Sequence, residues 1–160
     1  MLNHAKLKTQ LTIELTTEQD TQSFAVSLAK LIDSNLVIFL SGPLGAGKTT
    51  LVRYILAALG ITERIKSPTY TIVEPYTLSK LGKVVYHFDL YRLACAEELE
   101  LLGVREYFND ETISLIEWPQ NGKGVLPEAD LELTFSLDNR RRKLTIEANT
   151  LQGIKLLTDL

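Results

Sequence analysis

The 160-residue sequence predicts one α/β domain of three layers, with a mostly parallel central sheet and antiparallel additions. Three observations carry this prediction. Short apolar runs alternate along the chain with segments whose apolar residues recur at helical spacing. A glycine-rich turn joins one such run to a helical segment, as in the βα connections of parallel sheets. Two alternating runs near the C-terminal end predict a hairpin, which adds antiparallel strands.

The first third of the chain contains two predicted strands and two predicted helices. Residues 11–15 alternate between apolar and polar, as a half-buried strand does. Thr16 and Gln19 stand at capping-box spacing and predict the start of a helix, whose apolar face carries Phe24, Leu28, Leu31 and Ile32. Residues 36–40 are apolar and partly β-branched, which predicts a buried strand. After the glycine-rich turn, a second amphipathic helix ends at Gly60 and carries Leu51, Tyr54, Ile55, Ala58 and Leu59.

The remaining chain is richer in predicted strands. Residues 69–73 and 83–88 are expected to form strands with a turn near 79–82, and residues 96–102 a short acidic helix. Residues 113–116 predict another buried strand, which ends at Glu117. The predicted hairpin consists of residues 131–137 and 144–148, turning at Asp138 and Asn139. Residues 149–160 give no clear prediction.

Composition excludes several classes of function. The chain is 45% hydrophobic and 23% charged, which suits one globular domain over residues 1–160. Its net charge of −3 is unlike that of an autonomous nucleic-acid-binding protein, so any role in nucleic-acid chemistry is expected to run through partners. The longest clean apolar run, residues 36–40, is far shorter than the roughly 20 residues of a membrane span. Residues 1–6 lack a signal-peptide core, and one cysteine, Cys95, forms no internal disulfide. We therefore expect a cytoplasmic protein without membrane contact.

The sequence GPLGAGKT at residues 42–49 predicts a phosphate-binding loop. It fits the pattern GxxxxGK[ST] at every required position, with a buried strand before it and a helix after it. Glycines allow backbone N–H groups to turn onto phosphate oxygens, and the following helix directs its positive end at the same phosphates. Lys48 would place a cation on the β- and γ-phosphates, and the Thr49 hydroxyl would ligate Mg²⁺. The alternative is a glycine-rich turn that binds nothing.

Two acidic residues at strand ends are candidate partners of this loop. Glu117 follows the apolar run 113–116, where such proteins place a carboxylate that holds the magnesium shell. Asp89 ends the run 83–88 and could hold metal-bound water or orient the attacking water. Strand-end acids also cap helices, so Asp89 could instead be structural. His87 would share a face with Asp89 and is better explained as a packed or hydrogen-bonded residue than as a catalyst.

Two further segments leave their roles open. SPTY at residues 67–70 lies where many nucleotide switches place a loop whose hydroxyl senses the γ-phosphate, and it could equally be a polar turn into a strand. The basic run at residues 140–143 is typical of a solvated hairpin, although one arginine could reach a phosphate or base.

Four motifs taken together point to a family. They are GPLGAGKTT at 42–50, SPTYT at 67–71, YHFDLYR at 86–92 and IEWP at 116–119. In this order they closely resemble the bacterial TsaE (YjeE) family, P-loop ATPases of tRNA threonylcarbamoyladenosine biosynthesis. The resemblance covers about residues 11–148 and implies a P-loop NTPase-like fold. The glycine-rich loop alone would indicate only a superfamily, whereas the four motifs are far more specific.

The resemblance implies a single-domain protein that binds ATP and Mg²⁺ and hydrolyses ATP slowly by itself. In the family it works with a TsaB–TsaD complex, which transfers a threonylcarbamoyl group to the tRNA adenosine next to the anticodon. The family member is not the transferase, and its hydrolysis resets the complex between rounds. Contact with tRNA would therefore be indirect, which agrees with the acidic charge balance.

The family's site residues carry over by position. Lys48, Asp89 and Glu117 would be catalytic, and Thr49 and Glu117 would contact Mg²⁺. Glu18 is the best match to an acidic residue at the start of the first helix, and Arg142 matches an arginine that opens the last strand. Arg140 or Arg141 could take the place of Arg142. The nucleotide-binding set implied by the resemblance is Glu18, Gly45, Ala46, Gly47, Lys48, Thr49, Thr50 and Arg142.

Three other functions fit part of the sequence. A P-loop small-molecule kinase would usually carry an arginine-bearing lid and an acceptor pocket, and no clear arginine-rich lid is present. A GTPase would carry the motifs NKxD and DxxG, and both are missing. A non-catalytic sensor would use ATP binding alone to order a partner-docking surface. Carboxylates placed for Mg²⁺ would serve that sensor as well as an ATPase.

Overall fold

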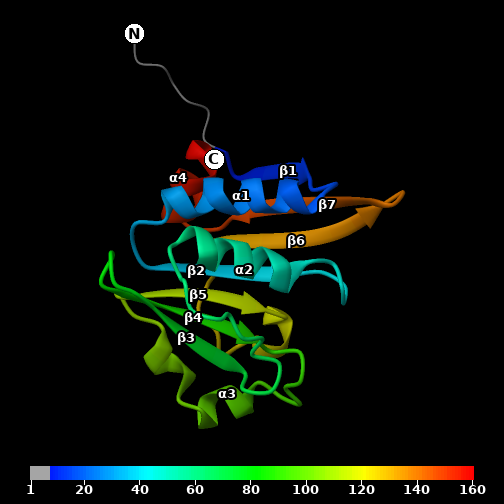
Figure 1. Ribbon diagram of the computed structural model, residues 1–160. Helices are drawn as coiled ribbons and strands as arrows, with labels where there is room; N and C mark the ends of the chain where they lie inside the picture. Colours follow the sequence, from blue (N-terminus) through cyan, green and yellow to red (C-terminus); the bar gives the residue numbers. More distant parts are fainter. Residues whose placement is uncertain (1–7) are drawn as a thin grey trace.

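The computed structural model describes residues 8–160, and these form an α/β fold around one seven-stranded sheet (Figure 1). The strand order is β1-β7-β6-β2-β5-β4-β3. Within the described residues, no helix has the length and apolar character needed to cross a membrane. The prediction about a signal peptide concerns residues 1–6, which lie outside this range.

The elements follow one another in the alternating order that the sequence predicts. The strands are β1 (Gln10–Glu14), β2 (Leu36–Ser41), β3 (Val73–Leu78), β4 (Lys83–Asp89), β5 (Thr112–Glu117), β6 (Leu131–Asp138) and β7 (Arg141–Ala148). The α-helices are α1 (Glu18–Leu31), α2 (Lys48–Ala58), α3 (Glu97–Leu101) and α4 (Leu151–Asp159). Two short 3₁₀-helices are η1 (Val104–Tyr107) and η2 (Pro119–Gly122).

The centre of the sheet is parallel and its flanks are antiparallel. Strand β2 pairs in parallel with β5 and β6, and β4 pairs in parallel with β5. The pairs β1–β7, β6–β7 and β3–β4 are antiparallel. Because β2, β4 and β5 run in one direction, their carboxyl ends meet at one edge of the sheet. There Glu117 is the register partner of both Leu40 and Asp89. The predicted fold class is confirmed.

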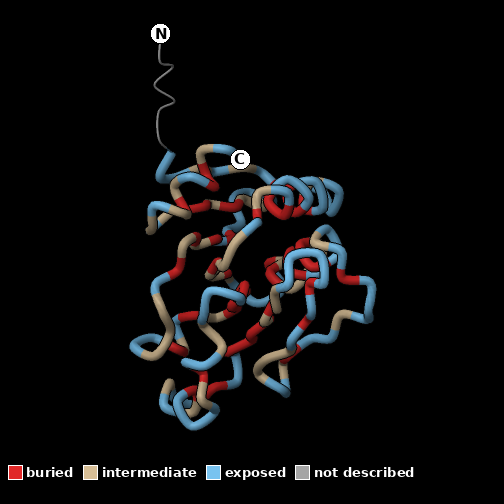
Figure 2. The backbone as a smooth tube through the Cα atoms, turned by 90° about the vertical axis from the view of Figure 1, so that its left-hand side faces the viewer, coloured by how far each residue is buried: buried red, intermediate tan, exposed pale blue. Residues whose placement is uncertain are grey.

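Helices cover the two faces of the sheet unequally. Leu36, Ile38 and Leu40 of β2 pack into the larger core with α1, α2 and α4, whereas Val37 and Phe39 face a smaller core near α3 and η1. This alternation is the period of two that a strand imposes on its side chains. Figure 2 shows the buried segments gathered inside the molecule and the exposed segments around them. The predicted three layers are therefore present, with shorter helices on the second face.

The predicted strand at residues 69–73 is wrong. The chain instead turns here, with the Ile72 amide donating to the Pro68 carbonyl at 2.8 Å and Ile72 in the left-handed region at φ 69°. Strand β3 begins at Val73 and includes Pro75. Proline is tolerated because β3 is an edge strand that pairs with β4 alone. The β-forming side chains of the SPTYT segment predict a strand, but the tertiary turn overrides that local preference.

Several predicted boundaries shift: β1 begins one residue earlier than predicted, at Gln10, and β7 begins three residues earlier, at Arg141. The helix cap and the hairpin turn shift by one residue. The capping box of α1 uses Thr17 and Asp20 in place of Thr16 and Gln19: the Asp20 amide donates to Thr17 Oγ1 at 3.1 Å, and the Thr17 amide donates to Asp20 Oδ2 at 2.7 Å. The β6–β7 hairpin turns at Asn139 and Arg140, whose φ values are 48° and 67°. A two-residue hairpin turn with both residues in this region is type I′.

Besides the two short 3₁₀-helices, helix α4 is an element that the sequence analysis missed. Its N-cap is Thr150, whose side chain accepts from the Gly153 amide at 3.1 Å and donates to Asp130 Oδ1 at 2.5 Å. The other carboxylate oxygen of Asp130 accepts from the Val37 amide at 2.8 Å. Leu156 and Leu157 of α4 enter the larger core. One aspartate therefore fastens α4 to the beginnings of β2 and β6.

Candidate functional site

The glycine-rich loop connects the carboxyl end of β2 to the N-terminus of α2. Gly42, Gly45 and Gly47 have φ values of 137°, 75° and 109°, which side chains with a Cβ rarely adopt. A Cβ on Gly42 would lie only 2.8 Å from the Cβ of Phe135, so the loop also requires glycine there to pass over β6. Helix α2 carries no acidic residue in its first turn. The loop thus presents free helix N–H groups to an anion.

Lys48 is folded back over this loop. Its Nζ donates to the carbonyl oxygens of Gly42 and Pro43 at 2.7 and 2.8 Å and lies 4.3 Å from the ring centroid of Trp118. The residue is only 4% exposed. Burial lowers the pKa of the Lys48 ammonium from its usual value, while Glu117 and Asp89 act in the opposite direction. The ammonium is therefore already placed over the loop, within reach of a phosphate that binds there.

Thr49 and Glu117 meet across the loop. The Thr49 hydroxyl lies 2.9 and 3.0 Å from the two carboxylate oxygens of Glu117. His87 Nε2 lies 2.8 Å from Glu117 Oε1. Glu117 and His87 are 2% and 0% exposed, so the carboxylate is held from both sides in a buried position. A hydroxyl and a carboxylate that converge in this way are oxygen donors of the kind that Mg²⁺ prefers.

Asp89 lies beside Glu117 and shapes a turn. Its Oδ1 accepts from the Tyr91 amide at 3.0 Å, and its Oδ2 is 3.4 Å from the Thr69 hydroxyl. The residue does not cap a helix, which was the structural alternative for Asp89. It instead closes a two-residue Asx turn while its other oxygen faces the loop segment at Thr69.

A cavity of about 430 Å³ brings these residues together. Predicted site residues that line it are Gly45, Gly47, Lys48, Thr49, Thr50, Asp89 and Glu117. Thr69 of the SPTY segment lines it too. Four lining residues had no predicted role, namely Tyr91, Arg92, Trp118 and the exposed Leu44. Arg92 could have been noticed from its position, three residues after a strand-end acid.

Three of the predicted nucleotide-binding residues lie outside this lining. Ala46 is buried beneath the loop, at 3% exposure. Arg142 lies against the loop, since a Cβ on Gly47 would be 3.2 Å from its Nη1, and its buried Nε has no partner within residues 8–160. Glu18 accepts a hydrogen bond of 2.5 Å from the Tyr54 hydroxyl at the start of α1. A nucleotide contact for Glu18 stays a prediction.

The two alternatives to Arg142 point elsewhere. Arg140 occupies the hairpin turn itself. Arg141 Nη1 lies 3.7 Å from a carboxylate oxygen of Glu14 on β1. Of the three arginines, Arg142 is therefore the one that the hairpin places against the glycine-rich loop.

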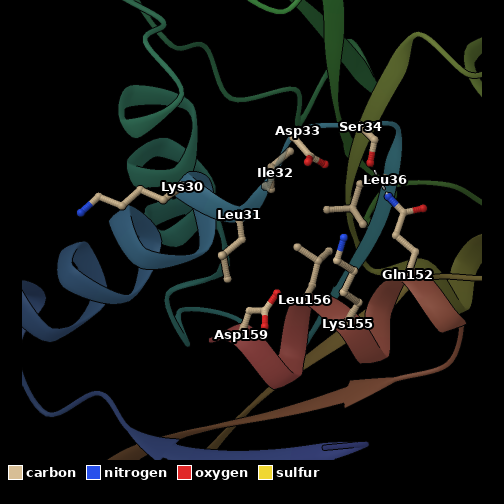
Figure 3. Close-up of a pocket in the computed structure, with 10 residues that line it drawn as sticks. All are labelled: Lys30, Leu31, Ile32, Asp33, Ser34, Leu36, Gln152, Lys155, Leu156 and Asp159. Atoms are coloured by element: carbon tan, nitrogen blue, oxygen red, sulfur yellow. Dashed lines mark hydrogen bonds between the residues drawn. The ribbon is translucent and has the colours of Figure 1, made fainter. Parts of the chain in front are cut away.

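A second, smaller cavity of about 220 Å³ lies at the opposite end of β2, between the C-terminus of α1 and helix α4 (Figure 3). Gln152 closes one side by donating to Ser34 Oγ at 2.8 Å and to the Asn35 carbonyl at 2.6 Å. The charged residues that line this cavity are two lysines and two aspartates, and Lys30 points away from the others. Balanced charges give an anion no preference for this cavity.

The parallel strand, the glycine-rich loop, the helix and the strand-end carboxylate define a P-loop-like α/β protein. Comparison with protein families matches residues 15–144 to the family described as "Threonylcarbamoyl adenosine biosynthesis protein TsaE". The chain therefore belongs to the TsaE family, which takes part in tRNA threonylcarbamoyladenosine biosynthesis. The resemblance found in the sequence is confirmed.

Individual relatives agree with this assignment. The TsaE protein of Haemophilus influenzae is 46% identical over 138 residues, covering 86% of each chain. The Bacillus subtilis TsaE protein is 34% identical over 131 residues, covering 81% of this chain and 80% of its own. The crystal structure of Bacillus subtilis YdiB superposes with a TM-score of 0.77 at 28% identity, covering 94% of this chain and 93% of the other.

Proposed function

We propose that this chain binds ATP with Mg²⁺ in the cavity at the glycine-rich loop and hydrolyses it weakly to ADP and phosphate. The hydrolysis supports the transfer of a threonylcarbamoyl group to the tRNA adenosine next to the anticodon by a TsaB–TsaD complex. The observation that carries the proposal is the convergence of Lys48, Thr49 and Glu117 at the carboxyl edge of the sheet. These groups suit a phosphate chain and its metal ion.

Phosphate binding rests on the loop and on Lys48. The N–H groups at the start of α2 and the positive end of the helix dipole favour negative charge. Lys48 now satisfies two loop carbonyls, so it exchanges these partners for phosphate oxygens without leaving the loop. The φ of 109° at Gly47 favours glycine there, and the Arg142 guanidinium lies 3.2 Å from where a Cβ on Gly47 would stand. Arg142 therefore adds positive charge beside the loop.

The donor set fits Mg²⁺ better than a metal held by protein alone. Within residues 8–160 no cluster of three or more His, Cys, Asp and Glu side chains could hold a metal ion. Mg²⁺ commonly keeps several waters and uses one or two protein ligands together with substrate phosphates. Thr49 and Glu117 would be those ligands, and the bound ion would neutralise charge that develops on the phosphates. His87 holds the Glu117 carboxylate in place from behind.

Asp89 is our candidate for orienting the attacking water. It lines the cavity, whereas the fully buried His87 does not. Its Oδ2 has one weak partner, the Thr69 hydroxyl at 3.4 Å, so that oxygen can accept a hydrogen bond from water. Lys48, Asp89 and Glu117 would then form the catalytic set.

Partner proteins are expected to act at the mouth of the cavity. Leu44 at the tip of the loop is 72% exposed and Tyr70 is 82% exposed, and large exposed apolar side chains of this kind suit a protein interface. The net charge of −3 disfavours direct binding of tRNA. TsaB and TsaD are therefore the proposed partners, and tRNA is reached through them.

The first test measures ATP hydrolysis by the pure chain with Mg²⁺, alone and with its cognate TsaB–TsaD pair. Weak turnover that changes when the pair is added supports the proposal. Absence of turnover in both cases, with tight ATP binding, would favour the non-catalytic sensor. Phosphate transfer to a metabolite would favour the kinase.

Substitution of Glu117 separates hydrolysis from sensing. The variant Glu117→Gln keeps the side-chain shape and still offers one oxygen to Thr49 and His87, so it is a better probe than Glu117→Ala alone. We expect both variants to bind ATP and to lose turnover together with support of tRNA modification. If modification survives the loss of turnover, ATP binding alone is what the pathway uses.

A further inference from the structure

Arg92 is a basic side chain in the cavity to which the proposed function gives no task. Lys48 and Arg92 are the two lysine or arginine residues among the described residues that line this cavity. Lys48 is engaged by the loop carbonyls. No carboxylate in residues 8–160 lies within ion-pair distance of Arg92. Its positive charge is therefore available to an anion in the cavity.

The backbone that carries Arg92 is held by hydrogen bonds to β4 and β5, the strands that end in Asp89 and Glu117. Asp89 Oδ1 accepts from the Tyr91 amide at 3.0 Å, and the Leu90 amide donates to the Glu117 carbonyl at 3.1 Å. Asn121 Nδ2 donates to the Leu90 carbonyl at 2.9 Å from η2. The turn that presents Arg92 thus also orients Asp89 and is bonded to Glu117. A side chain that acts at a defined position in a site needs a backbone that is held rigidly in this way.

The side chain of Arg92, in contrast, is held loosely. Its guanidinium carbon lies 4.4 Å from the ring centroid of Tyr70, and its Nη2 is 3.5 Å from the Tyr70 hydroxyl. Tyr70 is 82% exposed, and a cation–π contact at an exposed site is weak. A phosphate oxygen would form a shorter, charge-assisted hydrogen bond with the guanidinium. Tyr70 therefore serves as a resting place that Arg92 can leave.

We propose that Arg92 binds the terminal phosphate of ATP and thereby distinguishes ATP from ADP. This inference rests on the proposed function. The loop and Lys48 grip the phosphates from the α2 side, while Arg92 faces them from the β4 side, next to the candidate water-orienting Asp89. During hydrolysis the water oxygen bonds to the γ-phosphorus, whose bond to the bridging oxygen breaks. ADP keeps that oxygen, and one water proton passes to Asp89. While these bonds form and break, Arg92 neutralises negative charge on the γ-phosphoryl oxygens.

Departure of Arg92 from Tyr70 would also report which nucleotide is bound. Tyr70 belongs to the turn of residues 67–72, whose Ile72 carbonyl accepts from the Asp89 amide at 2.9 Å. With ADP the guanidinium stays on Tyr70, and with ATP the exposed ring is released. The Tyr70 ring at the mouth of the cavity is therefore covered by Arg92 when ADP is bound and uncovered when ATP is bound.

The test compares Arg92→Ala and Arg92→Lys with the control Arg105→Ala. Arg105 is an exposed arginine that pairs with Glu100 at 3.1 Å and does not line the cavity. Calorimetry on the intact chain with Mg²⁺ measures binding of ADP and of a non-hydrolysable ATP analogue, and turnover is measured separately. We expect Arg92→Ala to lose about tenfold or more in analogue affinity with ADP affinity unchanged. Turnover should fall by at least about a hundredfold, and the lysine variant should restore part of both.

Two outcomes would overturn the inference. Equal losses of ATP-analogue and ADP affinity would make Arg92 a general structural residue, and unchanged affinity for both nucleotides would show that it has no contact with the terminal phosphate. In both cases wild-type binding and turnover would still uphold the proposed function. Failure of the wild-type chain to bind either nucleotide would instead overturn both proposals. Tyr70→Ala provides a second check, because removing the resting place should leave analogue affinity equal or higher.

Discussion

Replacing Gly153 with alanine should displace helix α4 from its packing on Asp130 and destabilise the folded protein. A Cβ at this position would overlap the carbonyl oxygen of Asp130 and lie 2.8 Å from its carbonyl carbon, where ordinary contacts begin at 3.4 Å. The obstacle is backbone at the start of β6, so no side-chain rotation relieves it. The helix must move away, and its cap bond from the Gly153 amide to Thr150 at 3.1 Å weakens with it.

The expected cost follows from opposing contributions. Overpacking against backbone costs about 3 kcal/mol, at the upper end of the usual range. Weakening of the cap adds about 1 kcal/mol. Alanine is the better helix former by about 1 kcal/mol, which offsets the cap but not the clash. For a domain of this size, a net loss of about 3 kcal/mol lowers Tm by roughly 6–12 °C.

Thermal and urea unfolding of Gly153→Ala measure this loss directly. The matched control is Leu151→Ala in the same helix, whose side chain is 87% exposed and should change Tm little. A Gly153→Ala chain as stable as wild type, or more stable, would mean that helix propensity dominates. The close seating of α4 on Asp130 would then be refuted.

Three further predictions concern the loop, the turn and the first helix cap. Lys48→Ala should weaken ATP binding at least about tenfold in calorimetry, because the buried phosphate charge loses its cation; unchanged binding would refute this role. Asp89→Ala should lower turnover about a hundredfold and ATP affinity far less, and equal losses would assign Asp89 to the turn alone. Hydrogen bonds from Thr17 lower the pKa of Asp20. Its contribution to stability is therefore complete above its unfolded pKa of about 3.9 and is lost as pH falls through the lower folded pKa. Urea unfolding of Asp20→Asn should accordingly show a shallower loss of stability at acid pH than wild type.

Local patterns were enough to predict the parallel centre of the fold. The run at residues 36–40 and the motif at 42–49 place a strand, a loop and a helix by their own chemistry. Once strands run parallel, topology alone brings their carboxyl ends together, which is why Asp89 and Glu117 were found without a structure. The strand expected at 69–73 failed because a turn held by Pro68 and Ile72 outweighs β-propensity.

Contacts between distant parts of the chain could not be predicted. Helix α4 is short, contains a glycine, and depends on Asp130 some twenty residues earlier for its cap. The bond between Tyr54 and Glu18 and the stacking of Arg92 on Tyr70 depend on side-chain directions that spacing does not specify. Glu117 was expected at the metal, but its support by His87 from behind appears only in three dimensions.

The edges of the sheet influence how this chain can associate with others. Proline in β3 removes a donor from the open side of that strand, and β1 at the opposite edge has only five residues. Neither edge is a good template for a strand of another molecule, which guards against fibrillar growth. The proposed partners would therefore bind side chains on its faces and loops, in contacts that can be reversed.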